Sequence, residues 1–413
     1  MAHLKLLVIA QFSPPSSEVA ARRVGGLTKY LGRLGHEVTV LTSMASGSGP
    51  VEGAARTVRT RDLLTSRINW RRGQIESLKG QSADTYGAAS PLASLVVPDL
   101  SLVGWLPFAV ARALALERDD RPDAVLTTSP PESVHLAGFA LSSRGLPWIA
   151  DFRDGWNFER ATMRRWPHPV QQRIDDALEA AVARRASLAV GVTEPIATDL
   201  RDRLGTTAVT VTNGFDPELA GDWREEHPLV SPDRHTLVHT GRMAVMGRSP
   251  RPLLDAVLGA EDLHDRLEVV FAGALTAEER ELIEAPALEG IVRWAGSVEP
   301  EESLRLQRAA DSLLLFPEAA RQGHVPGKLY EYLATGKPIL AVGTGVSADM
   351  AAEAGVGASA PADDRAGIAV ALRELVERPR GNGRRPESVE RFAYPRLAER
   401  YAEQIELVVA RGR

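Results

Sequence analysis

The chain has 413 residues, 44% of them hydrophobic and 25% charged, and its formal net charge at pH 7 is −5. This balance is typical of an ordinary folded protein and gives no sign of a nucleic-acid partner, since nucleic-acid-binding domains are usually basic. The absence of cysteine excludes disulfides, thiolate catalysis and zinc-cysteine sites, and it fits a cytoplasmic protein. At this length, two domains of roughly 200 residues each are expected.

The first forty residues predict a parallel β-sheet. Leu4 to Ala10 is an apolar run of strand length, followed by Ser-Pro-Pro rather than by a signal-peptide cleavage site. The spacing from Arg22 to Leu34 predicts a helix, and His36 to Leu41 predicts a second strand. Strand, helix and strand in this order form a βαβ unit, and such sheets bind ligands at the carboxyl ends of their strands.

A locally basic segment, 56–79, interrupts the pattern. Between residues 52 and 84 there are seven Arg or Lys residues and four acidic ones, in a protein that is acidic as a whole. One interpretation is a surface that makes peripheral contact with an anionic membrane, at its inner face, or with a phosphorylated acceptor. The alternative is a solvated, variable insertion. No apolar stretch approaches the roughly 18–20 residues that span a bilayer.

The remainder of the first half continues the alternation. Helices are expected over 105–116, from the segment after Pro131 to Gly145, and over 170–186, with strands over 124–127, 148–151, 188–192 and 209–212. The strand at 148–151 leads directly into Asp151, Arg153 and Asp154, which would therefore lie at the ligand-binding edge of the sheet. After Asp216 the sequence becomes polar, which indicates a domain boundary.

A second alternation follows this boundary. Strands are expected over 236–240, 267–273, 291–295 and 312–316, and helices over 252–258, 277–284, 301–309 and 364–377, with a last helix over 392–409. We therefore predict an α/β fold with domains at 1–214 and 215–391 and a terminal helical segment, 392–413, that packs back on the first domain. Two such domains facing across a cleft would suit a nucleotide-linked substrate in one and an acceptor in the other.

The stretch GKLYEYLATGKPIL, residues 327–340, predicts a short helix ahead of a buried strand. Its apolar residues Leu329, Tyr330, Leu333 and Ala334 share one helical face, while Lys328, Glu331 and Tyr332 lie off that face. A helix N-terminus has unpaired N–H groups and a partial positive charge, so an added lysine there favours phosphate. Glu331, one turn later, could accept hydrogen bonds from sugar hydroxyls. The alternative is a solvated helix face.

Several motifs occur in a fixed order along the chain. They are FSPPSSEVAARR after the first strand, then SPPESVH, DFRDGW, TNGFD, HTGRM and GKLYEYLATGKPIL. Together they resemble the retaining glycosyltransferases of family 4, group 1, in particular bacterial transferases of polysaccharide and secondary-metabolite pathways. The resemblance covers nearly the whole chain. It implies the GT-B fold, in which two Rossmann-like domains bind the acceptor (first domain) and the nucleotide sugar (second domain).

The resemblance also implies a donor site for a nucleoside-diphosphate sugar, with UDP preferred. Lys328 would contact the diphosphate and Glu331 the ribose. A second basic contact is assigned to Arg248, with Arg242 as the alternative, because a guanidinium can bind two phosphate oxygens at once. Gly241, Gly327 and Leu329 complete the expected donor site.

Two departures from the family pattern affect this assignment. The first glutamate of the E-x7-E motif would fall at Gly323, and the nearest acid, Glu318, is out of register. The sugar is therefore expected against the backbone N–H groups of Gly323, His324 and Val325. The Gly-Gly pair of the first loop is also absent. Ser16 and Ser17 stand nearest its place, with Arg22 one turn into the helix.

Retaining transfer in this family is commonly explained by front-face attack, with the leaving diphosphate acting as base. Lys328 and Arg248 would then stabilise the leaving group. Asp151 and Asp154 could orient the acceptor hydroxyl, held by Arg153, or Asp151 and Arg153 could form a structural pair.

Two histidines are further candidates. His135 is either a histidine of the cleft or a structural one, and His239 is either catalytic or a cap on the end of its strand.

The sequence contains no DxD motif and no convincing pair of His or carboxylate residues at metal-ligand spacing. This predicts metal-independent transfer without a cofactor. The acceptor is expected to be a small molecule or a lipid-linked saccharide, and the protein a monomer or homodimer. Three alternatives remain open: a nucleotide-sugar epimerase, a sugar phosphorylase, and a non-catalytic nucleotide-sugar-binding subunit.

Overall fold

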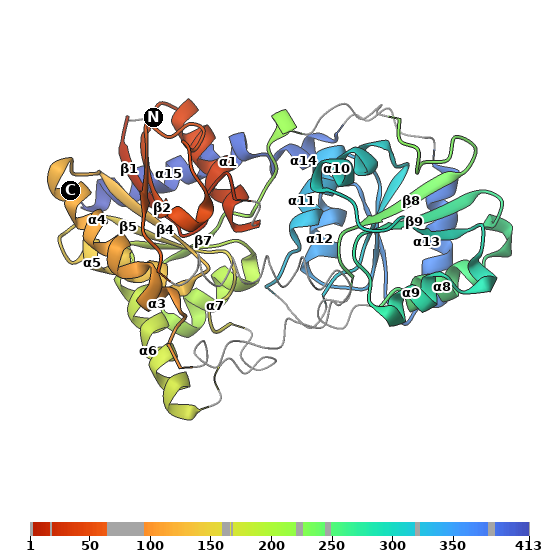
Figure 1. Cartoon of the computed structure of the whole chain (residues 1–413), viewed down its shortest axis with the longest axis horizontal. Helices are drawn as coiled ribbons and strands as arrows, with labels where there is room; N and C mark the ends of the chain where they lie inside the picture. The colour runs from red at the N-terminus through yellow and green to blue at the C-terminus, as the bar shows by residue number, and fades with distance from the viewer. Residues whose placement is uncertain are drawn as a thin grey trace. The chain divides into compact units, whose positions relative to one another are not determined.

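The computed structural model describes residues 3–16, 19–63, 95–158, 166, 168–219, 226–243, 249–318, 323–378 and 385–412. Over these ranges the chain forms two compact units. The first contains the described residues up to Gly214 together with 394–412, and the second contains those from Phe215 to Ala393. The two ends of the chain therefore belong to one unit, where the C-terminal helix α15 packs on the first helix, α1 (Figure 1).

A seven-stranded, fully parallel sheet forms the centre of the first unit, in the order β3-β2-β1-β4-β5-β6-β7. Its strands are β1 (Lys5–Ile9), β2 (Glu37–Ser43), β3 (Arg56–Thr60), β4 (Ala124–Ser129), β5 (Trp148–Phe152), β6 (Leu188–Gly191) and β7 (Ala208–Thr210). The inner strands β4, β5 and β6 are buried at every position, as expected for a parallel sheet covered on both faces. The edge strand β3 is instead exposed or half-buried.

Helices cover both faces of this sheet. They are α1 (Val19–Arg33), α3 (Ser101–Gly104), α4 (Leu106–Asp119), α5 (His135–Ser142), α6 (Pro169–Arg185), α7 (Glu194–Leu204) and α15 (Tyr394–Gly412), with short 3-10 turns η1 (Met44–Ser46) and η2 (Glu132–Val134). One hydrophobic core joins the sheet to α1 and α15, and includes Leu31 and Tyr401. The other joins it to α4, α5 and α7, and includes Leu141 and Trp148.

The second unit repeats this plan with six parallel strands in the order β10-β9-β8-β11-β12-β13. The strands are β8 (His235–Thr240), β9 (Leu267–Ala272), β10 (Val292–Trp294), β11 (Ser312–Leu315), β12 (Ile339–Val342) and β13 (Gly357–Ala360). The helices are α8 (Arg251–Leu258), α9 (Ala277–Ile283), α10 (Pro300–Ala309), α11 (Gly327–Thr335), α12 (Val346–Glu353), α13 (Arg365–Glu377) and α14 (Glu387–Glu390), with 3-10 turns η3 (Pro217–Leu219), η4 (Glu261–Leu263) and η5 (Pro286–Leu288). One core lies under α10, α11 and α12, and the other under α8 and α13.

The strand order positions the ligand sites. In the first sheet the order reverses between β1 and β4, and in the second between β8 and β11. In doubly wound sheets ligands bind at such a reversal, outside the carboxyl ends of the strands. The predicted α/β fold with two Rossmann-like domains is confirmed. The residues to consider for ligand binding are therefore those at the carboxyl ends of the strands beside these two reversals.

Several elements differ from the sequence-based expectation. The strands β3 and β13 and the helices α7 and α12 were not predicted. Of the basic segment 56–79, residues 56–60 form β3, and 64–79 lie outside the described residues. The terminal helix begins at Tyr394 rather than Phe392, because Phe392 and Ala393 pair with Phe215 in the second unit. Among the helices that the structure describes, none is long and apolar enough to cross a bilayer.

Candidate functional site

Lys328 lies in the first turn of α11, beside the carboxyl end of β8. Its Nζ is 3.1 Å from His239 Nε2 and donates a hydrogen bond of 3.3 Å to the carbonyl oxygen of Arg242. A Cβ atom added to Gly241 would lie 3.5 Å from the same Nζ. The structure therefore brings together three of the residues expected in the donor site and His239, a candidate catalytic residue.

His239 orients Lys328 at the point where the strand order of the second sheet reverses. It is buried in β8, and its Nδ1 lies 2.9 Å from the carbonyl oxygen of Leu314 in the neighbouring strand β11. Because a carbonyl can only accept, Nδ1 carries the proton, and Nε2 is left as an acceptor for the Lys328 ammonium. In this arrangement His239 is neutral, so it orients the charge of Lys328 without cancelling it.

The backbone at the end of β8 approaches its neighbour closely. Gly241 has φ of +84°, a conformation that side chains rarely adopt. A Cβ on Gly273, after β9, would stand only 2.4 Å from the Gly241 carbonyl oxygen. The glycines thus allow two strand-end loops to pack together next to Lys328.

Glu331 lies one turn after Lys328 and is held by a residue that sequence analysis missed. Its Oε2 accepts a hydrogen bond of 3.0 Å from Nε2 of Gln307, a fully buried residue of α10. Gln307 Nε2 is also 3.0 Å from Thr240 Oγ1 at the end of β8. The only local sign that Gln307 is buried was its position next to Leu306, on the apolar face of α10. Glu331 is thus oriented toward the same strand end as Lys328.

The helical spacing placed Tyr332 off the apolar face of α11, yet the structure buries it. The residue is fully buried, and its hydroxyl accepts a hydrogen bond of 3.1 Å from the backbone N–H of Thr240. Burial raises the pKa of Tyr332 to about 12. Helix α11 packs on more than one side, because it lies between the sheet and its neighbouring helices, so its buried face is wider than a simple stripe. Leu329 is fully buried in this core, and Gly327 is half-buried.

The loop before α11 contains the glutamate that had appeared out of register. Glu318, which follows β11, is buried, and its Oε2 lies 3.1 Å from Nδ1 of His324. The two atoms are close enough for an ion pair, although they are not aligned as a hydrogen bond. Gly323 and Val325, on either side of His324, are buried. A carboxylate therefore lies in the loop expected to hold the sugar, because the chain folds back between β11 and α11.

Two of the predicted site residues, Arg248 and Ser17, lie outside the described residues. Arg242 is exposed and contributes its backbone oxygen to Lys328. In the first unit, Ser16 is half-buried and its N–H bonds to Ser13 O at 3.1 Å, while Arg22 is exposed on α1.

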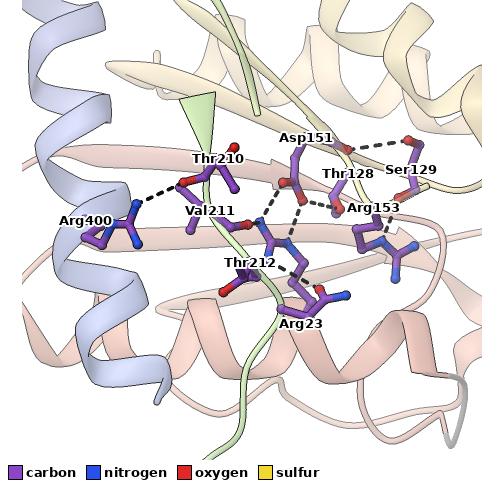
Figure 2. Close-up of polar contacts among 10 residues, drawn as sticks. Arg23, Thr128, Ser129, Asp151, Arg153, Thr210, Val211, Thr212 and Arg400 are labelled. Carbon is purple, nitrogen blue, oxygen red and sulfur yellow. Dashed lines mark hydrogen bonds and ion pairs between the residues drawn. The ribbon is translucent and has the colours of Figure 1, made fainter. Parts of the chain in front are cut away.

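Asp151, at the end of β5, is completely buried in an ion pair with Arg23 of α1 (Figure 2). Arg23 Nε and Nη2 donate to the two carboxylate oxygens at 2.9 and 2.8 Å, and Thr128 Oγ1 donates to one of them at 2.7 Å. The carboxylate attracts the guanidinium strongly enough to raise the pKa of Arg23 despite the cost of burial. Asp151 is therefore held in a buried structural pair, and its partner is Arg23 rather than Arg153.

Arg23 also forms hydrogen bonds with the backbone of the segment that follows β7, where the chain leaves the first unit. Nη2 donates to Val211 O at 2.9 Å, and Nη1 donates to Thr212 O at 2.6 Å. Helix α15 is attached nearby, where Arg400 donates to Thr210 O at 3.1 Å (Figure 2). Sequence reasoning chose Arg22 instead. The helical spacing of Arg23 with Leu27 and Leu31 was the signal that placed Arg23 on the buried face.

Arg153 bonds to backbone carbonyls. Its Nε donates to Ser129 O, at the end of β4, at 2.6 Å, and its Nη2 donates to Pro130 O, just after β4, at 2.9 Å. Asp154, the next residue, is half-buried.

His135 lies in the hydrophobic core, not at an open surface. Its ring packs on Phe152 and Trp156, and Nδ1 lies 2.8 Å from Thr127 Oγ1. Burial lowers the pKa of His135 to about 3. The structural alternative considered for this residue is the one that the geometry supports.

Over the part of the chain that the structure describes, no cluster of three or more His, Asp or Glu side chains could hold a metal ion.

Comparison with known proteins gives the family. The model of the glycosyl transferase 4-like domain matches residues 20–214, and that of glycosyl transferases group 1 matches residues 234–378. The chain is a family 4, group 1 glycosyltransferase. The predicted family and enzyme class are thereby confirmed, whereas no curated protein sequence matches this glycosyltransferase significantly.

Solved structures similar to this glycosyltransferase have the GT-B fold. A sucrose-phosphate synthase from Thermosynechococcus elongatus is 16% identical with a TM-score of 0.62, over 99% of this chain and 100% of that one. An α,α-trehalose 6-phosphate synthase from Burkholderia multivorans is 12% identical with a TM-score of 0.63, over 100% of both chains. Anabaena HepE, in complex with UDP and glucose, is 15% identical with a TM-score of 0.61, over 98% and 100%. At these identities the likeness is one of fold.

Proposed function

We propose that this glycosyltransferase moves a sugar from a nucleoside-diphosphate donor, UDP-sugar by preference, to a hydroxyl group of an acceptor, with retention and without a metal or other cofactor. The observation that carries the proposal is the position of Lys328. An ammonium group oriented by a neutral histidine stands at the N-terminus of α11 and at the strand reversal of the second sheet. A phosphate group is the ligand that this combination favours.

The contacts around Lys328 suggest how the two ends of a nucleotide would be held. The ammonium would neutralise the diphosphate, and its charge would matter most in the transition state, when the leaving oxygen becomes more negative. Glu331, oriented by Gln307, would accept hydrogen bonds from the ribose hydroxyls. The choice of UDP draws support from Anabaena HepE, a protein of the same fold that was crystallised with UDP and glucose and with UDP-glucose.

Retention and metal independence follow from the family resemblance. In front-face transfer the acceptor hydroxyl would attack on the side from which the diphosphate leaves, and the diphosphate would take the hydroxyl proton. The protein then supplies position and positive charge. Product anomers determined by NMR would test retention, and full loss of activity in EDTA would contradict metal independence.

Binding can be tested with a panel of UDP-, dTDP- and GDP-sugars in a thermal-shift experiment. A ligand at about 100 times its Kd stabilises the folded state by about 2.7 kcal/mol. For a domain of this size, this corresponds to a rise in Tm of roughly 5–10 °C. If no nucleotide sugar raises the Tm, the proposal is wrong. Binding without transfer would favour the non-catalytic subunit, and conversion of the donor without any acceptor would favour the epimerase.

A further inference from the structure

Arg153 is a buried cation in the first unit, and it has no carboxylate partner among the described residues. The residue is only 9% exposed, yet both of its side-chain hydrogen bonds go to backbone carbonyls, those of Ser129 and Pro130. Figure 2 shows this guanidinium bonded to the end of β4, while the neighbouring carboxylate of Asp151 is taken by Arg23. Within the described ranges, no carboxylate oxygen lies within ion-pair distance of Arg153, and its Nη1 donates no hydrogen bond.

The electrostatic balance at Arg153 is unfavourable for a structural cation. Burial lowers the pKa of Arg153 to about 10, and the repulsion of Arg23 contributes to this, whereas Asp151 and Asp154 act in the opposite direction. A buried guanidinium normally has a carboxylate of its own. Arg153 is therefore charged at neutral pH, and an added anion would relieve the cost of its burial.

The geometry suits a ligand. Arg153 follows β5 at the carboxyl edge of the first sheet, one strand away from the reversal between β1 and β4. The bonds from Nε and Nη2 to two carbonyls hold the planar group in one orientation. The remaining Nη protons form part of a preorganised fork, and such a fork binds two oxygen atoms of one phosphate or carboxylate.

We propose that Arg153 binds an oxyanion, a phosphate or a carboxylate, on the sugar acceptor. The acceptor of this glycosyltransferase is then an anionic molecule, and Arg153 selects it over its neutral counterpart. This inference rests on the proposed transfer function, because it assigns the first unit to the acceptor. The donor remains assigned to Lys328 in the second unit.

The test uses the full chain and compares its thermal shift with glucose 6-phosphate, glycerol phosphate, glucuronate and glucose, with UDP in a parallel series. In the wild type, at least one anion is expected to bind at least tenfold more tightly than glucose. Arg153→Gln should abolish this preference, Arg153→Lys should retain part of it, and both variants should keep the wild-type shift with UDP. Arg118→Gln, which changes an exposed arginine of α4, is the matched control and should behave as wild type.

Several outcomes would overturn the inference. It fails if no anion is preferred to glucose, or if Arg153→Gln keeps the preference while Arg118→Gln behaves as wild type. It also fails if Arg153→Gln loses the shift with UDP, because the anion would then be the diphosphate of the donor. A protein that responds to the anions through Arg153 but never to UDP would retain the anion site and contradict the proposed donor function instead. Circular dichroism of each variant separates lost binding from lost folding.

Discussion

Each unit has a cationic side chain in contact with a partner at the carboxyl end of its sheet, and the partners differ in charge. In the first unit Arg23 meets Asp151, and the side chains of both are almost inaccessible, at 1% and 0% exposure. In the second unit Lys328 meets His239, whose Nδ1 proton is committed to the Leu314 carbonyl. The first contact joins two opposite charges, whereas the second joins a charge to a neutral acceptor.

This difference supports the proposal that the first contact stabilises the fold and that the second serves a ligand. A carboxylate that receives two hydrogen bonds from one guanidinium satisfies both charges inside the protein. A neutral imidazole orients an ammonium but leaves its charge to act on an anion. Position at a strand end is therefore an incomplete guide to function, and the charge of the partner supplies the missing information.

The largest expected effect is on stability, from Asp151→Asn. The substitution leaves Arg23 buried without its counter-charge, and removing one member of a buried ion pair costs about 3–5 kcal/mol. Chemical denaturation should show this loss in the first unit. Where the variant is folded, its affinity for UDP should stay within about twofold of wild type, because the proposed nucleotide site is in the second unit.

The matched control for this prediction replaces both partners. Arg23→Met together with Asp151→Leu removes the pair without leaving a charge behind, and such replacements often restore stability. If the free energy of unfolding of Asp151→Asn is within about 1 kcal/mol of the wild-type value, the pair is not buried in solution and the comparison between the units fails.

Lys328→Ala should have the opposite profile. Removing a preorganised positive group from the leaving-group site is expected to lower kcat by roughly 10²–10³-fold and to weaken nucleotide-sugar binding. Stability should change little, because Lys328 is half-buried and its contacts with His239 and the Arg242 carbonyl are to neutral acceptors. Lys5→Ala, at an exposed ion pair with Asp120, is the control lysine. If Lys328→Ala were as active as the wild type, Lys328 would be only a solvated residue of the helix face, which is the alternative considered for it.

Much of the fold could be predicted because most strands are apolar runs bounded by turns. The two missed strands lie at sheet edges, where RTVRT of β3 and GASA of β13 contain no such run. Helix α7 could have been predicted, since Pro195 lies in its first turn and Gly205 ends it in the left-handed conformation.

The site was predictable only where it is local. Lys328 and Glu331 occupy one helix, and the helical period alone relates them. The partner of Lys328, His239, is 89 residues away, and the partner of Asp151, Arg23, is 128 residues away. Sequence spacing contains no information on such pairs until the strand order is known, so the role of Asp151 stayed open between the acceptor hydroxyl and a pair with Arg153, and Gln307 was overlooked.

The buried His135 of the first unit makes the stability of the fold depend on pH. The pKa of His135 is about 3 in the folded state and about 6.5 in the unfolded state. Between these values the unfolded chain binds a proton that the folded chain does not, so stability is complete above pH 6.5 and is lost as the pH falls toward 3. At pH 5 the loss is about 2 kcal/mol relative to pH 7.

His135→Asn should remove this part of the acid sensitivity while keeping a polar atom near Thr127. Urea titrations at pH 7 and pH 5, followed by tryptophan fluorescence, report on the site because Trp148 and Trp156 lie against the ring. Equal pH dependence in the variant and the wild type would show that His135 is accessible to protons in the folded protein.

The smallest expected effect tests how the second site is oriented. Gln307→Met has a similar volume but cannot donate to Glu331, so it should weaken UDP binding by roughly five- to tenfold, equivalent to about one hydrogen bond. Ser303→Ala removes another contact of Gln307, at 3.2 Å, without touching Glu331, and it should bind UDP as the wild type does. With 2′,3′-dideoxyuridine diphosphate, which lacks the ribose hydroxyls, Gln307→Met and wild type should bind equally. A loss that persists with the dideoxy compound would mean that Gln307 acts through Thr240 and the diphosphate end, so that Glu331 would no longer be the residue that recognises the ribose.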